Sequence, residues 1–411
     1  MEYIPGGVCA AKGFTAAGIH CGVKKTKKVL PGTEAKKDLA LIVSSVPCTA
    51  AGVFTRNQVK AAPVLLDMER LKNGTAQALV VNSGNANACA PHGAEYALRM
   101  GKLASEILGL EEDLVLVGST GVIGQTLNIE AIEKGLPMAA AALSDSGSDD
   151  ASSAIMTTDT VEKTGAVTFE IGGVPVRLGG IAKGSGMIHP NMGTMLCYLT
   201  TDCAISSTML DRALHRAADV SFNRISVDGD TSTNDSCIIL ANALAENPVI
   251  DGPGPAYDAF LAALSELCVF LARKMAADGE GAEHLITCQV SGAADEDKAA
   301  RLGKSVIGST LTKCAVFGCD ANWGRVLCAM GFSGETFDPE QVDIAFRSAA
   351  GEVDVCRSGR GLDFDEALAA AILKEKEVII DIKMYEGDGK ATTWGCDMTY
   401  EYVKINGDYR T

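Results

Sequence analysis

The chain of 411 residues has few aromatic residues, 5%, and few basic ones, since 36 Lys and Arg face 52 Asp and Glu for a net charge of −16. Such a surface repels phosphate groups, which argues against nucleic-acid or anionic-membrane partners. We find no run of eighteen or more predominantly apolar residues, and the opening MEYIPGGVCA lacks the basic and apolar regions of a secretion signal. We therefore expect a soluble, cytoplasmic protein.

Several familiar motifs are also missing. The five histidines form no HxxxH pair, and no GxSxG is present. LGKS at 302–305 ends like a phosphate-binding loop, but Lys298 stands where the first glycine is required. DGDTSTND at 228–235 suggests calcium, yet Thr233 and Ile239 occupy the glycine and glutamate positions of an EF-hand. We therefore expect no metal, and we favour a structural hydrogen-bonded network for DGDTSTND over a ligand cage.

The cysteines show no pattern of disulfide or metal chemistry. All fourteen are scattered singly, without a CxxC pair, and several lie in apolar runs. In a large, unexported chain this favours buried, reduced thiols that act as small hydrophobes.

The order of predicted elements indicates a layered α/β fold. Hydrophobic residues make up 47% of the chain, enough for a substantial interior. Apolar runs predict strands at 39–46, 78–88, 114–124, 285–292, 377–385 and 391–406, and a hairpin at 166–182. Helical spacing is present at 94–109, 206–222 and 256–278. Because there is no regular βαβ period, the pattern favours a layered α/β or α+β fold over a Rossmann series. We predict mixed sheets sandwiched by helices, with a main region over 1–284 and a smaller C-terminal α/β subdomain over 285–411.

One stretch, KGSGMIHPNMGTMLCYLTTD at 183–202, places turn residues directly before Thr194 and an apolar run. A threonine that becomes the first residue of a chain can use its own α-amine as the base. Its hydroxyl can free that amine by attacking the preceding carbonyl, which a small residue such as Gly193 favours. The plainer alternative, a threonine that opens a buried strand after a turn, is favoured on this stretch alone.

PNMGTMLCYLTTD at 190–202 closely resembles the cleavage and nucleophile motif of the ornithine acetyltransferase family, the glutamate N-acetyltransferases of arginine biosynthesis. Further motifs of that family follow its order along nearly the whole chain: NSGNANA (82–88), GSTGVIG (118–124), IMTTDT (155–160), VDGDTSTND (227–235), GEGA (279–282), CDANWGR (319–325) and YVKINGDYRT (402–411).

The resemblance implies self-cleavage between Gly193 and Thr194. The α chain (1–193) and β chain (194–411) then stay together and assemble as an α2β2 heterotetramer. Thr194 takes the acetyl group of N2-acetylornithine and passes it to L-glutamate in a ping-pong reaction through an acetyl-threonine ester. No cofactor is implied, and it stays open whether acetyl-CoA is a co-substrate in a second, glutamate-charging activity.

The matched motifs also imply roles for particular residues. Thr120 and Gly121 would form the oxyanion hole. Substrate would be bound by Thr157, Lys183, Thr194, Glu280, Asn406 and Thr411. Most of these roles have a plainer alternative. Thr120 and Gly121 could lie in a strand-end turn, Lys183 and Glu280 could be surface charges, and Asn406 and Thr411 could lie in a frayed terminus. The resemblance implies instead that the C-terminal tail folds back over the site as a lid.

Two positions depart from the family pattern. Gly193 replaces a common alanine, and because glycine is equally small we expect cleavage to persist. Glu283-His284 follows EGA where Thr-Lys is frequent, which bears on donor and acceptor preference. Two other functions remain: an amidase or aminopeptidase that uses the same threonine with water as acceptor, and a non-catalytic scaffold in which Thr194 is structural.

Overall fold

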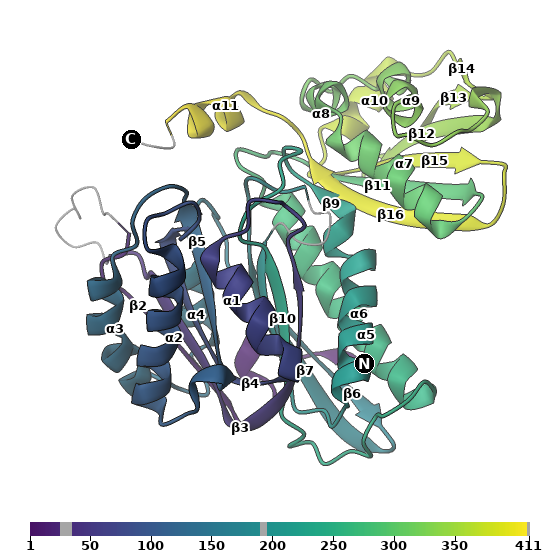
Figure 1. The fold of residues 1–411 in the computed structure, drawn as a ribbon. Coiled ribbons are helices and arrows are strands. Elements are labelled where there is room, and N and C mark those ends of the chain that lie inside the picture. The colour runs from purple at the N-terminus through teal and green to yellow at the C-terminus, as the bar shows by residue number, and fades with distance from the viewer. Residues whose placement is uncertain (25–34, 190–194, 409–411) are drawn as a thin grey trace. The chain divides into compact units, whose positions relative to one another are not determined.

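The computed structural model describes residues 1–24, 35–189 and 195–408 (Figure 1). The chain forms two compact units. The first unit comprises Met1–Gly184, Pro190–Asn223 and Thr231–Leu271, and the second comprises Ser185–His189, Arg224–Asp230 and Ala272–Thr411. The subdomain predicted for 285–411 lies within the second unit, which also takes in residues 272–284 and two short segments from earlier in the chain.

The first unit is a mixed sheet with helices. Its described strands are β1 (Glu2–Tyr3), β2 (Phe14–Ile19), β3 (Leu39–Phe54), β4 (Thr75–Asn85), β5 (Val115–Val122), β6 (Lys163–Ile171), β7 (Val174–Lys183), β8 (Leu196–Thr201) and β10 (Ser236–Ala241). Its helices are α1 (Ala62–Arg70), α2 (Gly93–Leu108), α3 (Ile129–Ala141), α4 (Ser148–Ile155), α5 (Ser207–Val220) and most of α6 (Pro255–Ala277). The strand order is β1-β6-β7-β8-β10-β3-β4-β5, with β2 beside β3.

Both faces of this sheet are buried. Along β3, Leu39 and Leu41 pack with α2 and α3 on one face, where Met100 and Leu136 join them. Their neighbours in the strand point to the opposite face, which α4 covers. A strand buried on both faces needs apolar residues at every position, which explains the unbroken apolar runs in the sequence. Parallel pairs such as β4–β5 and β8–β10 stand beside antiparallel ones, as expected for a layered α/β fold.

The second unit has its own sheet, in the order β14-β13-β12-β15-β11-β16-β9. The strands are β9 (Ile225–Ser226), β11 (Leu285–Ala293), β12 (Val342–Ser348), β13 (Gly351–Arg357), β14 (Arg360–Gly361), β15 (Glu377–Met384) and β16 (Gly389–Cys396). The helices are α7 (Glu296–Gly308), α8 (Thr310–Phe317), α9 (Trp323–Gly331), α10 (Glu366–Leu373) and α11 (Tyr400–Gly407). Alternate residues of β15, Val378, Ile380 and Ile382, enter the core beneath α7, α9 and α10.

The strand predicted for 391–406 is wrong over its second half. β16 ends at Cys396, and α11 begins at Tyr400. The carboxylate of Asp397 accepts hydrogen bonds from the backbone N–H groups of Glu283 and His284, which turns the chain out of the sheet. Thr399 then caps α11 by accepting from the Glu401 N–H.

The expectation about long apolar segments also needs correction. α6 is long and apolar enough, by length and composition, to cross a membrane. Core residues such as Phe260, Leu264 and Leu267 are buried along it, and the Phe260 ring lies 6.3 Å from that of Phe169 in β6. A core helix of a globular protein passes the same test, and this packing identifies α6 as one.

The fourteen cysteines are free thiols, and eight of them are buried: Cys48, Cys197, Cys203, Cys237, Cys268, Cys288, Cys356 and Cys396. Burial raises the pKa of several of these thiols, for example that of Cys48 to about 12. The prediction of reduced, core-forming cysteines is confirmed for these eight positions.

We expect a thiol reagent at neutral pH to modify the native protein fastest at Cys89, Cys314 and Cys328, which are exposed. The eight buried thiols should react only after denaturation, because the fold makes them inaccessible to the reagent. Peptide mass spectrometry with and without denaturant measures this. Rapid native modification of Cys197 or Cys288 would contradict the packing.

Candidate active site

Thr120 and Gly121 lie within β5 and not in a turn at the strand's end. At the end of the β4–β5 pair the register shifts: Gly121 stands opposite Gly84, and Asn85 pairs with both Thr120 and Val122. Gly121 has a φ of 134°, and a Cβ there would collide with the backbone of Gly84. Only glycine fits this close approach, so the irregularity fixes how the Gly121 amide is presented.

A buried hydrogen-bonded network holds this strand end. The side chain of Asn234 donates to the carbonyls of Ala86, at 2.6 Å, and Ser119, at 2.8 Å. The hydroxyl of Ser119 donates to Asn82 Oδ1 at 2.6 Å. Asn234 belongs to DGDTSTND, so the structural network predicted for that motif is confirmed here, and it braces the residue that precedes Thr120.

Asp159 brings together two of the predicted substrate residues. Its carboxylate accepts from the Thr157 N–H at 3.0 Å and from the Gly184 N–H at 2.7 Å. It also pairs with the ammonium groups of Lys163, at 2.8 Å, and Lys183, at 3.9 Å. Thr157 and the end of β7 are therefore held by one side chain.

Lys183 is buried, with 7% of its surface exposed, so the alternative of a solvated surface lysine is wrong. Burial by itself raises the pKa of Asp159, but the positive charges of Lys183 and Lys163 outweigh it and hold that pKa well below its usual range. Asp159 is thus a carboxylate, and it keeps a lysine ammonium in place where water is largely excluded. Such a fixed cation suits a substrate carboxylate.

The chain that follows Thr194 is firmly anchored. Met195 is buried, its carbonyl accepts from the Ser236 N–H at 2.9 Å, and its N–H donates to the carboxyl of Asp235. Burial raises the pKa of Asp235 well above its usual range. β8 then runs between β7 and β10 with all six residues buried, so the predicted apolar segment is a central strand.

In the second unit, Glu280 and Asn406 contact each other. Asn406 Nδ2 donates to Glu280 Oε2 at 2.7 Å, and Glu280 is only 7% exposed. A Cβ at Gly186 would collide with the Glu280 carboxylate, so that carboxylate lies directly against the backbone of the 185–189 segment. Asn406 in α11 thus contacts Glu280 within the second unit, and the expected lid over the site stays a prediction.

Glu283 and His284, which stand where the family often has Thr-Lys, lie in different surroundings. Glu283 is exposed, whereas His284 is buried and its Nδ1 lies 2.8 Å from Asp397 Oδ2. His284 thus helps to fix the chain where it leaves β16.

Three predicted site residues, Gly193, Thr194 and Thr411, lie outside the described residues. The others are divided between the units: Thr120, Gly121, Thr157 and Lys183 lie in the first, where Asp159 links Thr157 and Lys183, and Glu280 and Asn406 lie in the second. Their catalytic and binding roles stay predictions.

Sequence reasoning missed two charged residues of the first unit, Asp159 and Lys24. Asp159 lies inside the quoted IMTTDT, two residues after Thr157, and a lone acid between threonines was the available signal. Lys24 packs over Gly84, and burial lowers its pKa to about 8. In the sequence Lys24 begins a run of lysines, which is typical of a solvated surface, so the pattern did not indicate a buried lysine.

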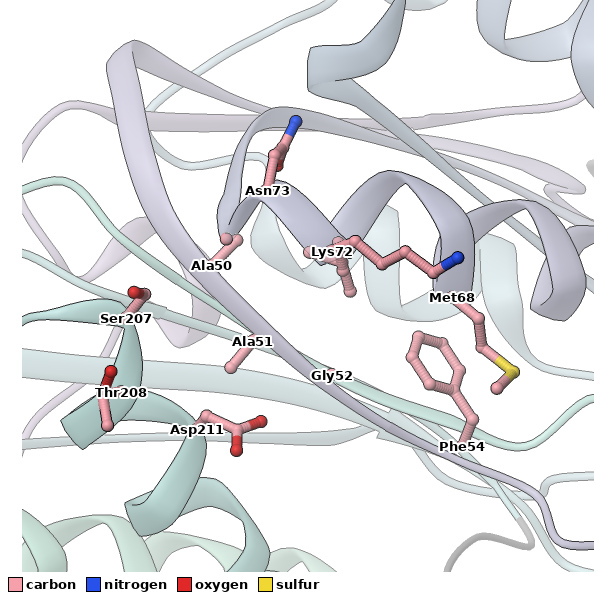
Figure 2. Close-up of a pocket in the computed structure, with 12 residues that line it drawn as sticks. Ala50, Ala51, Gly52, Phe54, Met68, Lys72, Asn73, Ser207, Thr208 and Asp211 are labelled. Atoms are coloured by element: carbon pink, nitrogen blue, oxygen red, sulfur yellow. The ribbon is translucent and has the colours of Figure 1, made fainter.

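Figure 2 shows a separate groove of about 440 Å³ in the first unit. Its floor is the small-residue stretch Ala50, Ala51 and Gly52 of β3, with Met68 of α1 and Asp211 of α5 on its sides. None of the predicted site residues that the structure describes lines this groove, so it is distinct from the candidate active site.

Known proteins resemble this chain over nearly its whole length. Residues 15–411 match a family model described as "ArgJ family". The chain is 52% identical to "Arginine biosynthesis bifunctional protein ArgJ" of Symbiobacterium thermophilum and 50% identical to the protein of that name from Caldanaerobacter subterraneus, over 100% of each chain. A crystal structure of ornithine acetyltransferase from Mycobacterium tuberculosis, complexed with ornithine, is 36% identical over 47% of this chain and 99% of that chain, with a TM-score of 0.42.

The two sheets and their covering helices define a protein of the layered α/β class. More particularly, the chain belongs to the ArgJ family, and it is an acyltransferase of arginine biosynthesis.

We expect Asp159→Asn to lower the free energy of unfolding by about 3 kcal/mol at pH 7, because two buried ammonium groups lose their countercharge. The folded-state pKa of Asp159 lies below the unfolded value of about 3.9, so its stabilisation is fully present above that value and is lost as the pH falls through the folded pKa. Urea unfolding of both proteins between neutral and acid pH should show the difference shrinking toward low pH. A pH-independent difference would contradict the ion-pair origin.

Proposed function

We propose that this protein is a glutamate N-acetyltransferase that moves the acetyl group of N2-acetylornithine to L-glutamate through an acetyl-Thr194 ester. The observation that supports the proposal most directly is that Lys183 is buried and pairs with Asp159. The carboxylate of Asp159 also accepts a hydrogen bond from the Thr157 N–H. It is a fixed cation suited to the α-carboxylate that N2-acetylornithine, ornithine and glutamate share. The family membership and the nucleophile motif at 190–202 support the same reaction.

Maturation comes first. The Thr194 hydroxyl attacks the Gly193 carbonyl, and the C–N bond breaks to free the α-amine of Thr194 and leave an ester between Gly193 and the threonine oxygen. Water then hydrolyses that ester, which releases the Gly193 carboxylate and the Thr194 hydroxyl. That amine, with an ordinary pKa near 8, then serves as the base. The anchoring of Met195 by Asp235 and Ser236 supports a defined position for the new chain terminus.

In the transfer, the Thr194 hydroxyl gives its proton to the α-amine and adds to the acetyl carbonyl. The Thr120 hydroxyl and the Gly121 N–H stabilise the resulting oxyanion. The C–N bond to ornithine breaks as the amine returns the proton to the leaving nitrogen. Glutamate then enters, its amino group attacks the ester, and N-acetylglutamate leaves as Thr194 regains its proton.

Donor and acceptor differ at the end of the side chain. Ornithine ends in an ammonium group, and the buried carboxylate of Glu280, oriented by Asn406, suits it. Glutamate ends in a carboxylate, which Glu280 repels. We therefore assign Glu280 to the donor, and its role lies in binding acetylornithine.

The transfer itself needs no cofactor, since Thr194 carries the acetyl group. Because relatives at 50% and 52% identity are named bifunctional, we also propose that acetyl-CoA acetylates Thr194 in a second activity. We further propose that the α and β chains form an α2β2 heterotetramer in the cytoplasm, where the fourteen free thiols are compatible with a reducing environment.

The test is intact mass under denaturing conditions, before and after incubation with N2-acetylornithine. We expect fragments 1–193 and 194–411, and the second should gain the mass of one acetyl group. Thr194→Ala should remain a single, inactive chain. A cleaved, active Thr194→Ala protein would falsify the nucleophile assignment, and release of acetate without transfer to glutamate would indicate the alternative amidase.

Thr120→Ala should lower kcat for acetyl transfer about 100- to 1000-fold, because one oxyanion donor is lost. Thr120→Ser keeps the hydroxyl and should retain most activity. Steady-state rates of both variants, measured on cleaved protein, provide the comparison. Equal rates for the alanine and serine variants would remove Thr120 from the oxyanion hole.

A further inference from the structure

The segment Ser185–His189 is held by hydrogen bonds to the described residues of the second unit. The Ser185 carbonyl accepts from the Glu280 N–H at 2.8 Å, and the Ile188 carbonyl accepts from the Val227 N–H at 2.6 Å. His189 Nδ1 lies 2.9 Å from Ser226 Oγ. Glu280, the residue we assign to the donor, is therefore attached at its backbone to a segment that is itself fixed.

Asp228 is the side chain that fixes this segment most directly. Its carboxylate accepts from the backbone N–H groups of Met187, at 2.6 Å, and Ile188, at 2.9 Å. Met187 has a φ of 55°, a left-handed conformation that is costly for a residue with a side chain. Two charge-assisted hydrogen bonds to one carboxylate are the kind of interaction that maintains such a conformation.

Tyr402 connects Asp228 to the C-terminal helix. Its hydroxyl donates to Asp228 Oδ2 at 3.3 Å. Burial, together with the negative charges of Asp228 and Glu280, raises the pKa of Tyr402 above its usual range, so the phenol keeps the proton that it donates. The carboxylates of Asp228 and Glu280 therefore both raise the pKa of the Tyr402 hydroxyl.

These contacts form two paths that both connect Glu280 to Asp228. One path runs from the Glu280 backbone through Ser185 to Met187 and Asp228. The other runs from the Glu280 carboxylate through Asn406, which shares α11 with Tyr402, back to Asp228. Helix α11 is thus attached at two points one turn apart, at Asn406 to the buried Glu280 and at Tyr402 to the partly buried Asp228.

We propose that Tyr402 and Asp228 are positioning residues that set the preference for the acetyl donor, by holding Asn406 and the Glu280 carboxylate in the orientation that receives the ornithine ammonium group. This inference rests on the proposed function, because it requires that Glu280 binds the donor. Its specific content is that the Tyr402–Asp228 hydrogen bond affects the donor and leaves the acceptor unaffected, since glutamate has no ammonium group at its side-chain end.

The test is Tyr402→Phe, which removes one hydroxyl and keeps the ring. We expect the KM for N2-acetylornithine to rise about three- to tenfold, the worth of one hydrogen bond, with the KM for L-glutamate and kcat unchanged. Tyr400→Phe is the matched control: it makes the same change on the same helix at a residue that is 85% exposed, and it should leave both constants unchanged.

Glu280→Gln provides the second comparison. If Tyr402 acts through Glu280, adding Tyr402→Phe to Glu280→Gln should raise the donor KM little further, whereas independent effects would multiply. A merely structural role would raise both KM values or slow self-cleavage, which intact mass detects. Either that result or an unchanged donor KM in Tyr402→Phe would overturn the positioning role.

The proposed acetyl transfer and the positioning role of Tyr402 are contradicted by different results. Wild-type enzyme that is cleaved but transfers no acetyl group from N2-acetylornithine would count against the proposed function. L-Ornithine binding to wild type and Tyr402→Phe, measured by calorimetry, then tests the positioning role without turnover. Equal affinities would overturn it, and a three- to tenfold weaker affinity of the variant would support it.

Discussion

The first unit depends on one buried carboxylate. Asp159 lies between two ammonium groups, and its two oxygens also receive backbone N–H groups on either side of β6 and β7. A charge in this setting is tolerable only when it is paired and fully hydrogen-bonded, so the lysines and the carboxylate require each other. The position of Lys183 follows from this requirement, and with it the carboxylate recognition we propose.

The candidate oxyanion donors depend on a different constraint, the close approach of two backbones. Gly121 and Gly84 lie opposite each other at the irregular end of β4 and β5, where no side chain fits. The network around Asn234 then holds the strand end. Rigid, pre-oriented donors stabilise a developing charge without reorganisation, which is the physical advantage of placing them on a braced strand.

The fold class and several strands were predictable from local pattern, and two errors have identifiable causes. Apolar runs located the central strands because a sheet buried on both faces excludes polar residues. The same reasoning failed at 400–406, where α11 replaces the expected strand, because Asp397 binds backbone groups more than a hundred residues earlier in the chain. Propensity within a short window cannot register such a long-range contact. α6 likewise looks apolar enough for a membrane until its core packing is known.

For the site, the sequence by itself determined the family and the motif on which the proposed nucleophile and cleavage point rest, because these depend on the order and spacing of residues along the chain. Only the tertiary structure decided that Lys183 is buried, that Asp159 pairs with it, and that Asn406 meets Glu280. Burial and charge pairing depend on which distant segments pack together, and that packing determines whether a lysine is a solvated surface charge or a fixed recognition group.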